Sequence, residues 1–143
     1  MSRPNTYEEK IFSPARAILS KNTSSFSEWL SVLEILASLS GGFDINEYWA
    51  IVGCQVFTNT LLLKTAQALK AELKRIDVPI SIGISILARE PIQESRQKET
   101  GAFYTDFRLA QILAHKTQSI LKRDSDVADL ASGTGILLSA VCE

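Results

Sequence analysis

Residues 25–76 carry the periodicity of amphipathic helices, and this pattern restricts the fold more than any other stretch of the chain. Ser25 and Glu28 have the spacing of a capping box, which marks a helix start. Apolar side chains then recur at intervals of three and four residues: Phe26, Trp29, Leu30, Leu33, Leu36 and Ala37. The pair Gly41-Gly42 predicts the end of this helix. A shorter helical turn is expected to begin at Pro14, where a missing N–H is tolerated.

A second helical pattern occupies residues 44–76, with Asp44 as its predicted N-cap. Gly53 and residues 58–60 are the places where we expect it to bend or break. Its second half has an apolar stripe with charged residues on the opposite face: Leu62, Ala66, Leu69, Leu73 and Ile76. We interpret the stripe as core, with pairing to a helix of a partner protein as the alternative.

The spacing of the apolar residues changes after residue 76. Isoleucines alternate with small residues over 78–86, which predicts a strand near 78–88 with Pro79 at its beginning. Residues 89–99 are charged and predict a linker, so we place a domain boundary between 97 and 98. Beyond it the pattern predicts a short strand at 127–130 and a helix from 136. Between the domain boundary and this strand, an amphipathic helix is marked by Leu109, Ile112, Leu113 and Ile120.

The composition is that of an ordinary globular protein, with 45% hydrophobic and 22% charged residues among 143. The formal net charge of −1 gives no global basic field that would indicate nucleic-acid binding. The most apolar run, Trp49–Leu63, is too short and too polar to span a bilayer, so no membrane partner is expected. Cys54 and Cys142 lack metal-ligand spacing and favour reduced thiols in a cytoplasmic protein. His115 has no second ligand at metal-binding spacing, so we expect a histidine at the surface or at the boundary of the core, and no metal site.

Two short segments carry the residues that point to a ligand. The first is an aromatic turn, Gly101-Ala102-Phe103-Tyr104-Thr105. The second follows after the length of one helix and reads Asp129-Leu130-Ala131-Ser132-Gly133-Thr134-Gly135. Glycines allow a ligand to approach the backbone closely, and N–H groups at a helix start attract an anion. Taken alone, the glycine loop is equally consistent with a structural turn or with nucleotide binding.

In this order and separation the two segments resemble the opening motifs of N6-adenine-specific DNA methyltransferases, which use S-adenosylmethionine. The matching residues are Gly101, Phe103, Tyr104 and Thr105 in the first motif, and Asp129, Ala131, Gly133, Gly135 and Leu138 in the second. The chain departs from the family pattern at Asp106 and Leu130, where proline is usual, and at Ser132, where cysteine is frequent.

The resemblance implies a role for each matching position. Phe103, Tyr104 and Thr105 would line the methionine end of S-adenosylmethionine, and Asp129 would lie near its amino group. Ala131, Gly133 and Gly135 would pass their backbone beneath the cofactor. The implied fold is α/β and helix-rich: a helical N-terminal region (1–97) followed by the first part of an incomplete Rossmann-like methyltransferase domain (98–143).

The resemblance also implies an activity, methyl transfer from S-adenosylmethionine to N6 of adenine in DNA, in a restriction-modification system. The family's catalytic loop is a Pro-Pro-aromatic tetrapeptide, and the chain has none, because Pro4, Pro14, Pro79 and Pro91 are isolated. No catalytic residue is therefore assigned, and DNA is a partner expected of the full-length family. The alternative is a non-catalytic assembly module of a restriction-modification or defence system, with helices of residues 25–76 contacting a protein partner. A further alternative is an unrelated nucleotide-binding α/β protein.

Overall fold

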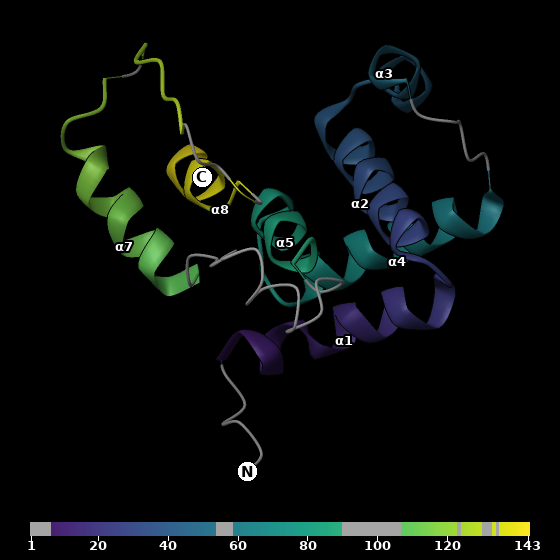
Figure 1. Cartoon of the computed structure of the whole chain (residues 1–143). Helices are drawn as coiled ribbons and strands as arrows, with labels where there is room; N and C mark the ends of the chain where they lie inside the picture. Colours follow the sequence, from purple (N-terminus) through teal and green to yellow (C-terminus); the bar gives the residue numbers. More distant parts are fainter. Residues whose placement is uncertain (1–6, 54–58, 90–106, 123, 130–132, 134) are drawn as a thin grey trace, which may run out of the picture. The chain divides into compact units, whose positions relative to one another are not determined.

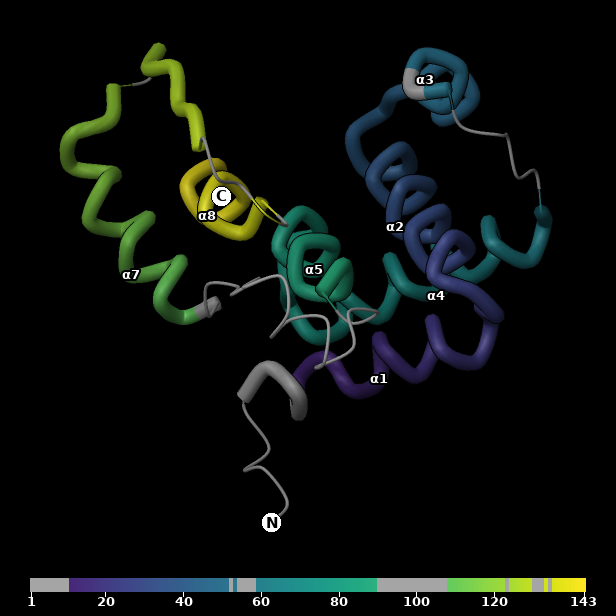
Figure 2. The backbone as a smooth tube through the Cα atoms, viewed as in Figure 1, coloured from purple at the N-terminus to yellow at the C-terminus, as the bar shows by residue number. Residues whose placement is uncertain are grey.

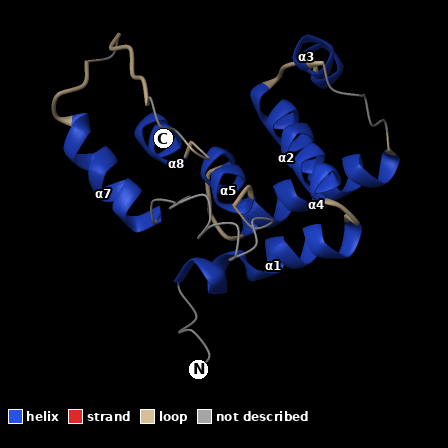
Figure 3. Ribbon diagram, viewed as in Figure 1, coloured by secondary structure: helices blue, strands red, loops and turns tan. Residues whose placement is uncertain are grey.

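In the computed structural model, every regular element within the described residues is a helix (Figure 3). The described residues are 7–53, 59–89, 107–122, 124–129, 133 and 135–143. The helices are α1 (Tyr7–Asn22), α2 (Phe26–Gly41), α3 (Ile45–Val52), α4 (Thr60–Arg75), α5 (Ile80–Leu87), α7 (Phe107–Gln118) and α8 (Ile136–Cys142) (Figure 1). The chain divides into two compact units, Met1–Ile80 (unit 1) and Ser81–Glu143 (unit 2).

The expected α/β class is wrong, because the part of the chain that the structure describes contains no strand and no sheet. The strand predicted near 78–88 is the helix α5. Residues 127–129 of the second predicted strand have no regular secondary structure, and Leu130 lies outside the described residues. The Rossmann-like portion of the expected fold is thereby overturned. The boundary predicted between 97 and 98 falls within residues 90–106, which are not described.

The prediction of a strand in place of α5 was wrong for a geometric reason. An alternation of period two also contains the spacing of four residues that places side chains on one helix face. In α5 the isoleucines four apart, Ile82 and Ile86, are both buried, whereas Ile80 and Ile84 are half-buried. Gly83 is buried beside them. A short apolar run therefore does not distinguish a strand from a buried helix.

Unit 1 is built on α4, which packs against both α1 and α2 (Figure 1). Most of its core comes from these three helices, and Trp49 of α3 is buried as well. The buried apolar residues of the three helices are Phe12, Ala15 and Leu19 of α1, Trp29, Val32, Leu33, Ile35 and Leu36 of α2, and Leu62, Ala66, Leu69 and Leu73 of α4. The predicted stripe of α4 is thus confirmed as core, with only Ile76 half-exposed at the helix end. Pro14 lies inside α1 rather than at a helix start.

The start of α2 confirms the predicted capping box. The backbone N–H of Glu28 donates to Ser25 Oγ at 3.2 Å. The Glu28 carboxylate accepts from the backbone N–H of Ser24 at 2.6 Å and from its hydroxyl at 2.8 Å. These bonds, the backbone one above all, lower the pKa of Glu28. At the other end Gly42 adopts φ 71°, as the predicted glycine stop requires.

The break between α3 and α4 also follows local signals. Asp44 caps α3 by accepting the N–H groups of Asn46 and Glu47. Gly53 ends the helix with φ 71°. Asn59 then caps α4 by accepting the Leu61 N–H at 2.9 Å. No helix in the described ranges is long and apolar enough to cross a membrane.

Unit 2 contains the packed pair α7 and α8 (green and yellow in Figure 2). The buried side chains of this pair are small or branched: Ala110 and Ala114 of α7, and Ile136 and Ala140 of α8. The larger side chains that predicted the helix, Leu109, Ile112 and Leu113, are exposed. The helix was predicted correctly, but the face that packs is the alanine face.

Serine side chains link α5 to α8 within unit 2. Ser85 Oγ lies 3.0 Å from Ser139 Oγ and donates its own hydrogen to the Ser81 carbonyl at 2.9 Å. Ser81 Oγ donates to a carboxylate oxygen of Glu143. Because Ser85 is buried, its hydroxyl needs such partners to offset lost hydration.

Candidate functional site

The candidate site is the stretch from Asp129 to the start of α8 in unit 2. Asp129, Gly133 and Gly135 are the expected cofactor-binding residues that the structure describes. The other expected residues, Phe103, Tyr104, Thr105 and Ala131, lie outside the described residues, so their predicted roles are not tested.

Both glycines of the loop adopt left-handed backbone conformations. Gly133 has φ 52° and Gly135 has φ 75°. Residues with a Cβ pay a steric cost in this region, and glycine does not. At Gly135 the positive φ favours glycine, and a lack of space does not. A Cβ at this position would meet nothing closer than Ser85 Oγ at 4.0 Å. Gly135 is the N-cap of α8, which begins at the next residue, Ile136.

Asp129 lies in the wall of a cavity of about 370 Å³ within unit 2. Three segments form the walls. They are Leu113, Ala114 and Thr117 of α7, residues 127–129, and Leu137, Leu138 and Val141 of α8. Asp129 is the one charged residue among these lining residues, and its Oδ2 atom is buried. Among the described residues, the lining of the cavity is therefore mostly apolar, with one hydroxyl (Thr117) and one carboxylate (Asp129).

This combination suits a ligand with an apolar body and a cationic or strongly donating group. Apolar walls bind by excluding water, and a few polar groups fix the orientation. A carboxylate pairs best with an ammonium or another charged donor, because such hydrogen bonds are about twice as strong as neutral ones. An anionic group beside Asp129 would instead be repelled.

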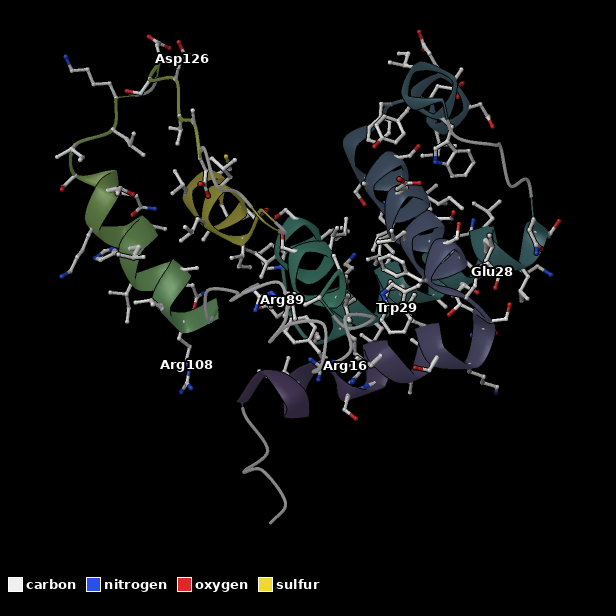
Figure 4. The ribbon with its side chains drawn as sticks, in the orientation of Figure 1. Arg16, Glu28, Trp29, Arg89, Arg108 and Asp126 are labelled. Carbon is white, nitrogen blue, oxygen red and sulfur yellow. The ribbon has the colours of Figure 1, made fainter. Side chains whose placement is uncertain are left out.

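The nearby Asp126 provides a contrast. It lies on the same connection between α7 and α8 (Figure 4) but is exposed and does not line the cavity. The turn before it is closed by the Lys122 N–H, which donates to Ser125 Oγ at 2.9 Å. Asp126 and Asp129 thus share a segment and a charge but differ in environment.

Within the part of the chain that the structure describes, the remaining titratable candidates do not come together in a site. His115 is exposed on α7, as predicted. Within the described ranges no group of three or more potential metal ligands comes together. Cys142 is an exposed free thiol, and Cys54 lies outside the described residues.

The α7 wall of the cavity and the serine hydrogen bonds between α5 and α8 were not predicted from the sequence. The α7 wall uses Leu113, which the pattern had only identified as part of an amphipathic face. Ser81 and Ser85 stand four residues apart in a run of isoleucines, and this spacing is the signal that could have identified a polar stripe on a helix. The strand interpretation placed both on one face of a sheet instead.

Comparison of the chain with models of known protein families, with curated proteins and with solved structures gives no match.

Proposed function

We propose that unit 2 forms the methionine-binding side of an S-adenosylmethionine site, and that the chain is the N-terminal part of a DNA adenine-N6 methyltransferase. The observation that carries the proposal is Asp129, a carboxylate in the wall of a mostly apolar cavity, followed by two glycines with positive φ. The sequence resemblance assigns the same residues to the cofactor. The incomplete Rossmann-like fold is not part of the proposal.

The chemistry of the cofactor fits this site. Its methionine moiety carries an ammonium group, which Asp129 would accept in a charge-assisted hydrogen bond. The apolar walls from α7 and α8 suit the less polar part of the ligand, and about 370 Å³ lies at the lower end of the range of small-molecule sites. Gly133 and Gly135 let the backbone run close to the ligand.

In this proposal the chain binds cofactor but does not by itself act on adenine. Its 143 residues contain no Pro-Pro-aromatic tetrapeptide to hold a flipped base. Groups that recognise DNA and handle adenine have to come from outside these residues. DNA is accordingly a partner of the assembled enzyme, not of unit 2 alone.

One observation favours the second candidate function, a non-catalytic assembly module. Apolar side chains on and just after α7 are exposed, with Ile112 at 55% and Ile120 at 77%. Where such side chains form one contiguous patch, they mark a surface that is covered in an assembly. The α4 stripe does not serve this purpose, because it is buried against α1 and α2.

A two-dimensional amide NMR titration of the full chain with S-adenosylmethionine tests the cofactor proposal. We expect shifts in residues 113–117 and 127–141. Asp129→Asn should weaken binding about tenfold or more, since it removes a charged hydrogen bond worth roughly 1.5–3 kcal/mol. Asp126→Asn is the matched control and should bind like the parent.

A second ligand separates the methionine end from the rest of the molecule. 5′-Methylthioadenosine lacks the amino-acid group, so its weaker binding should be the same in the parent and in Asp129→Asn. If Asp129→Asn and Asp126→Asn bind S-adenosylmethionine equally well, or if no shift appears in unit 2, the cofactor proposal fails. The assembly module then becomes the better candidate.

A further inference from the structure

The face of α7 that points away from α8 carries large apolar side chains. The helix packs on α8 through Ala110 and Ala114, which are buried. Leu109 and Ile112 lie on the opposite face and are exposed, and Ile120 is exposed in the turn that follows the helix. The small side chains of α7 are therefore used within unit 2, and large ones remain accessible at its surface.

Lys116 lies in the middle of these apolar side chains. It follows Ile112 by four residues and precedes Ile120 by four, a spacing that places side chains one helical turn apart on one face. The helical path continues into the turn, because the Leu121 N–H donates to the Thr117 carbonyl at 3.1 Å. Lys116 is itself exposed. We define the outer stripe of α7 as Leu109, Ile112, Lys116 and Ile120.

Among the described helices, α7 is the one that carries basic side chains and no carboxylate. Arg108 is exposed in its first turn (Figure 4), and His115 and Lys116 lie in its last turn. In the whole chain, by contrast, 15 basic and 16 acidic side chains nearly balance. A partner that covers the outer stripe therefore meets positive charge. If the Lys116 ammonium is removed from water, it has to be paired with an acid.

We propose that the outer stripe of α7 docks a helix of another protein, and that this helix presents a carboxylate between two apolar side chains, each one turn away. This inference rests on the second candidate function, in which the exposed side chains of α7 are covered in an assembly. The carboxylate pairs with Lys116, and the apolar side chains cover Ile112 and Ile120. A helix fits the stripe in size, because the 12 residues of α7 span roughly 18 Å and offer one free face.

Other occupants fit the outer stripe less well. A helix that binds a lipid surface keeps its cations on the polar face, whereas Lys116 stands in the middle of the apolar one. The phosphate backbone of DNA would pair with Lys116 but would leave Ile112 and Ile120 without an apolar partner. A second copy of α7 would bring Lys116 against a helix that has no carboxylate.

Two synthetic helical peptides of about 18 residues test the proposal. Both carry a pair of leucines two turns apart, and the residue midway between the leucines is glutamate in one peptide and lysine in the other. Their binding to the full chain is measured by fluorescence anisotropy. We expect a Kd on the order of 0.1 mM for the glutamate peptide. The lysine peptide should bind about tenfold more weakly, because like charges then face each other.

Charge reversal at Lys116 gives the sharpest readout. Lys116→Glu should prefer the lysine peptide by about tenfold, which a general loss of folding would not produce. Lys122→Glu makes the same change at an exposed lysine outside the stripe and should keep the parent's preference. Ile112→Ala should weaken binding of the glutamate peptide about fivefold. Gln111→Ala, at an exposed position on another face of α7, should leave it unchanged.

The proposal is overturned if the parent binds both peptides equally or binds neither, or if Lys116→Glu keeps the parent's preference. Binding of phosphatidylglycerol vesicles without binding of either peptide would assign the stripe to a lipid surface instead. Dimerisation that Ile112→Ala abolishes in sedimentation velocity would assign it to a second copy. The cofactor proposal is tested separately, because Asp129 lies outside the outer stripe and Asp129→Asn should bind both peptides like the parent.

Discussion

Truncation of Leu69 tests the core of unit 1 most directly. Leu69 is 0% exposed and lies on the buried stripe of α4, the helix that packs against both α1 and α2. Leu69→Ala removes three carbon groups, which corresponds to roughly 2.4 kcal/mol of transfer free energy at about 0.8 kcal/mol each. The cavity that remains adds to this, so we expect a loss of about 3 kcal/mol, within the range of about 2–5 for buried leucines.

This loss is large relative to the stability available to unit 1. At about 0.05–0.15 kcal/mol per residue, a unit that spans Met1–Ile80 is stable by roughly 4–12 kcal/mol. The assay is urea unfolding of the full chain followed by tryptophan fluorescence. Both tryptophans, Trp29 and Trp49, belong to unit 1, so the signal reports this unit. The midpoint should fall while the slope stays constant.

Leu61→Ala is the control, because it makes the same substitution on the same helix at a side chain that is 48% exposed. We expect it to cost less than about 1 kcal/mol, in line with surface substitutions. If Leu61→Ala destabilises unit 1 as much as Leu69→Ala, the assignment of the buried face of α4 is wrong. If neither variant shifts the midpoint, α4 is not the centre of the core.

Three further predictions concern single positions. Asp77 follows α4 with φ 54°, a left-handed conformation that strains a residue with a Cβ, and the Val78 N–H donates to the Leu73 carbonyl. Asp77→Gly should therefore raise the free energy of unfolding, measured by urea unfolding, by about 0.5–1 kcal/mol. Asp77→Ala should not raise it, because alanine keeps the Cβ. The pKa of Glu28 is lowered by the Ser24 backbone bond, so its stabilising effect is present above the unfolded value near 4.5 and is lost as the pH falls through the lower folded pKa. The urea midpoints of the parent and Glu28→Gln should therefore differ at neutral pH and converge in acid; a constant gap would contradict this. Ser85→Ala and Ser139→Ala should each cost about 1 kcal/mol, and the double variant should cost less than their sum, as measured by hydrogen exchange in unit 2.

Helix ends were the features that the sequence predicted best, because their causes are local. Ser25 and Asp44 lie next to the N–H groups that they accept, and glycine alone makes a left-handed residue such as Gly42 inexpensive. Gly53, which ends α3 with a positive φ, is a local signal of the same kind. None of these signals depends on where the rest of the chain lies.

The features that the sequence failed to predict depend on tertiary packing. The alternation at 80–87 fits a strand locally, and only the burial of Ile82 and Ile86 on one helix face distinguishes α5. On α7 the largest apolar side chains identified a helix but not its packed face. Ala110 and Ala114 pack instead, and small residues of this kind let two helices approach closely.

In the candidate site, too, the local features could be predicted from the sequence and the features that depend on tertiary packing could not. Positive φ at Gly133 and Gly135 was predictable from residue type, whereas the cavity beside Asp129 was not, because α7 and α8 form its walls. The loss of the predicted sheet therefore leaves the cofactor proposal dependent on this cavity alone. For that reason Asp129 and Asp126, which differ in whether they line the cavity, are the pair that decides it.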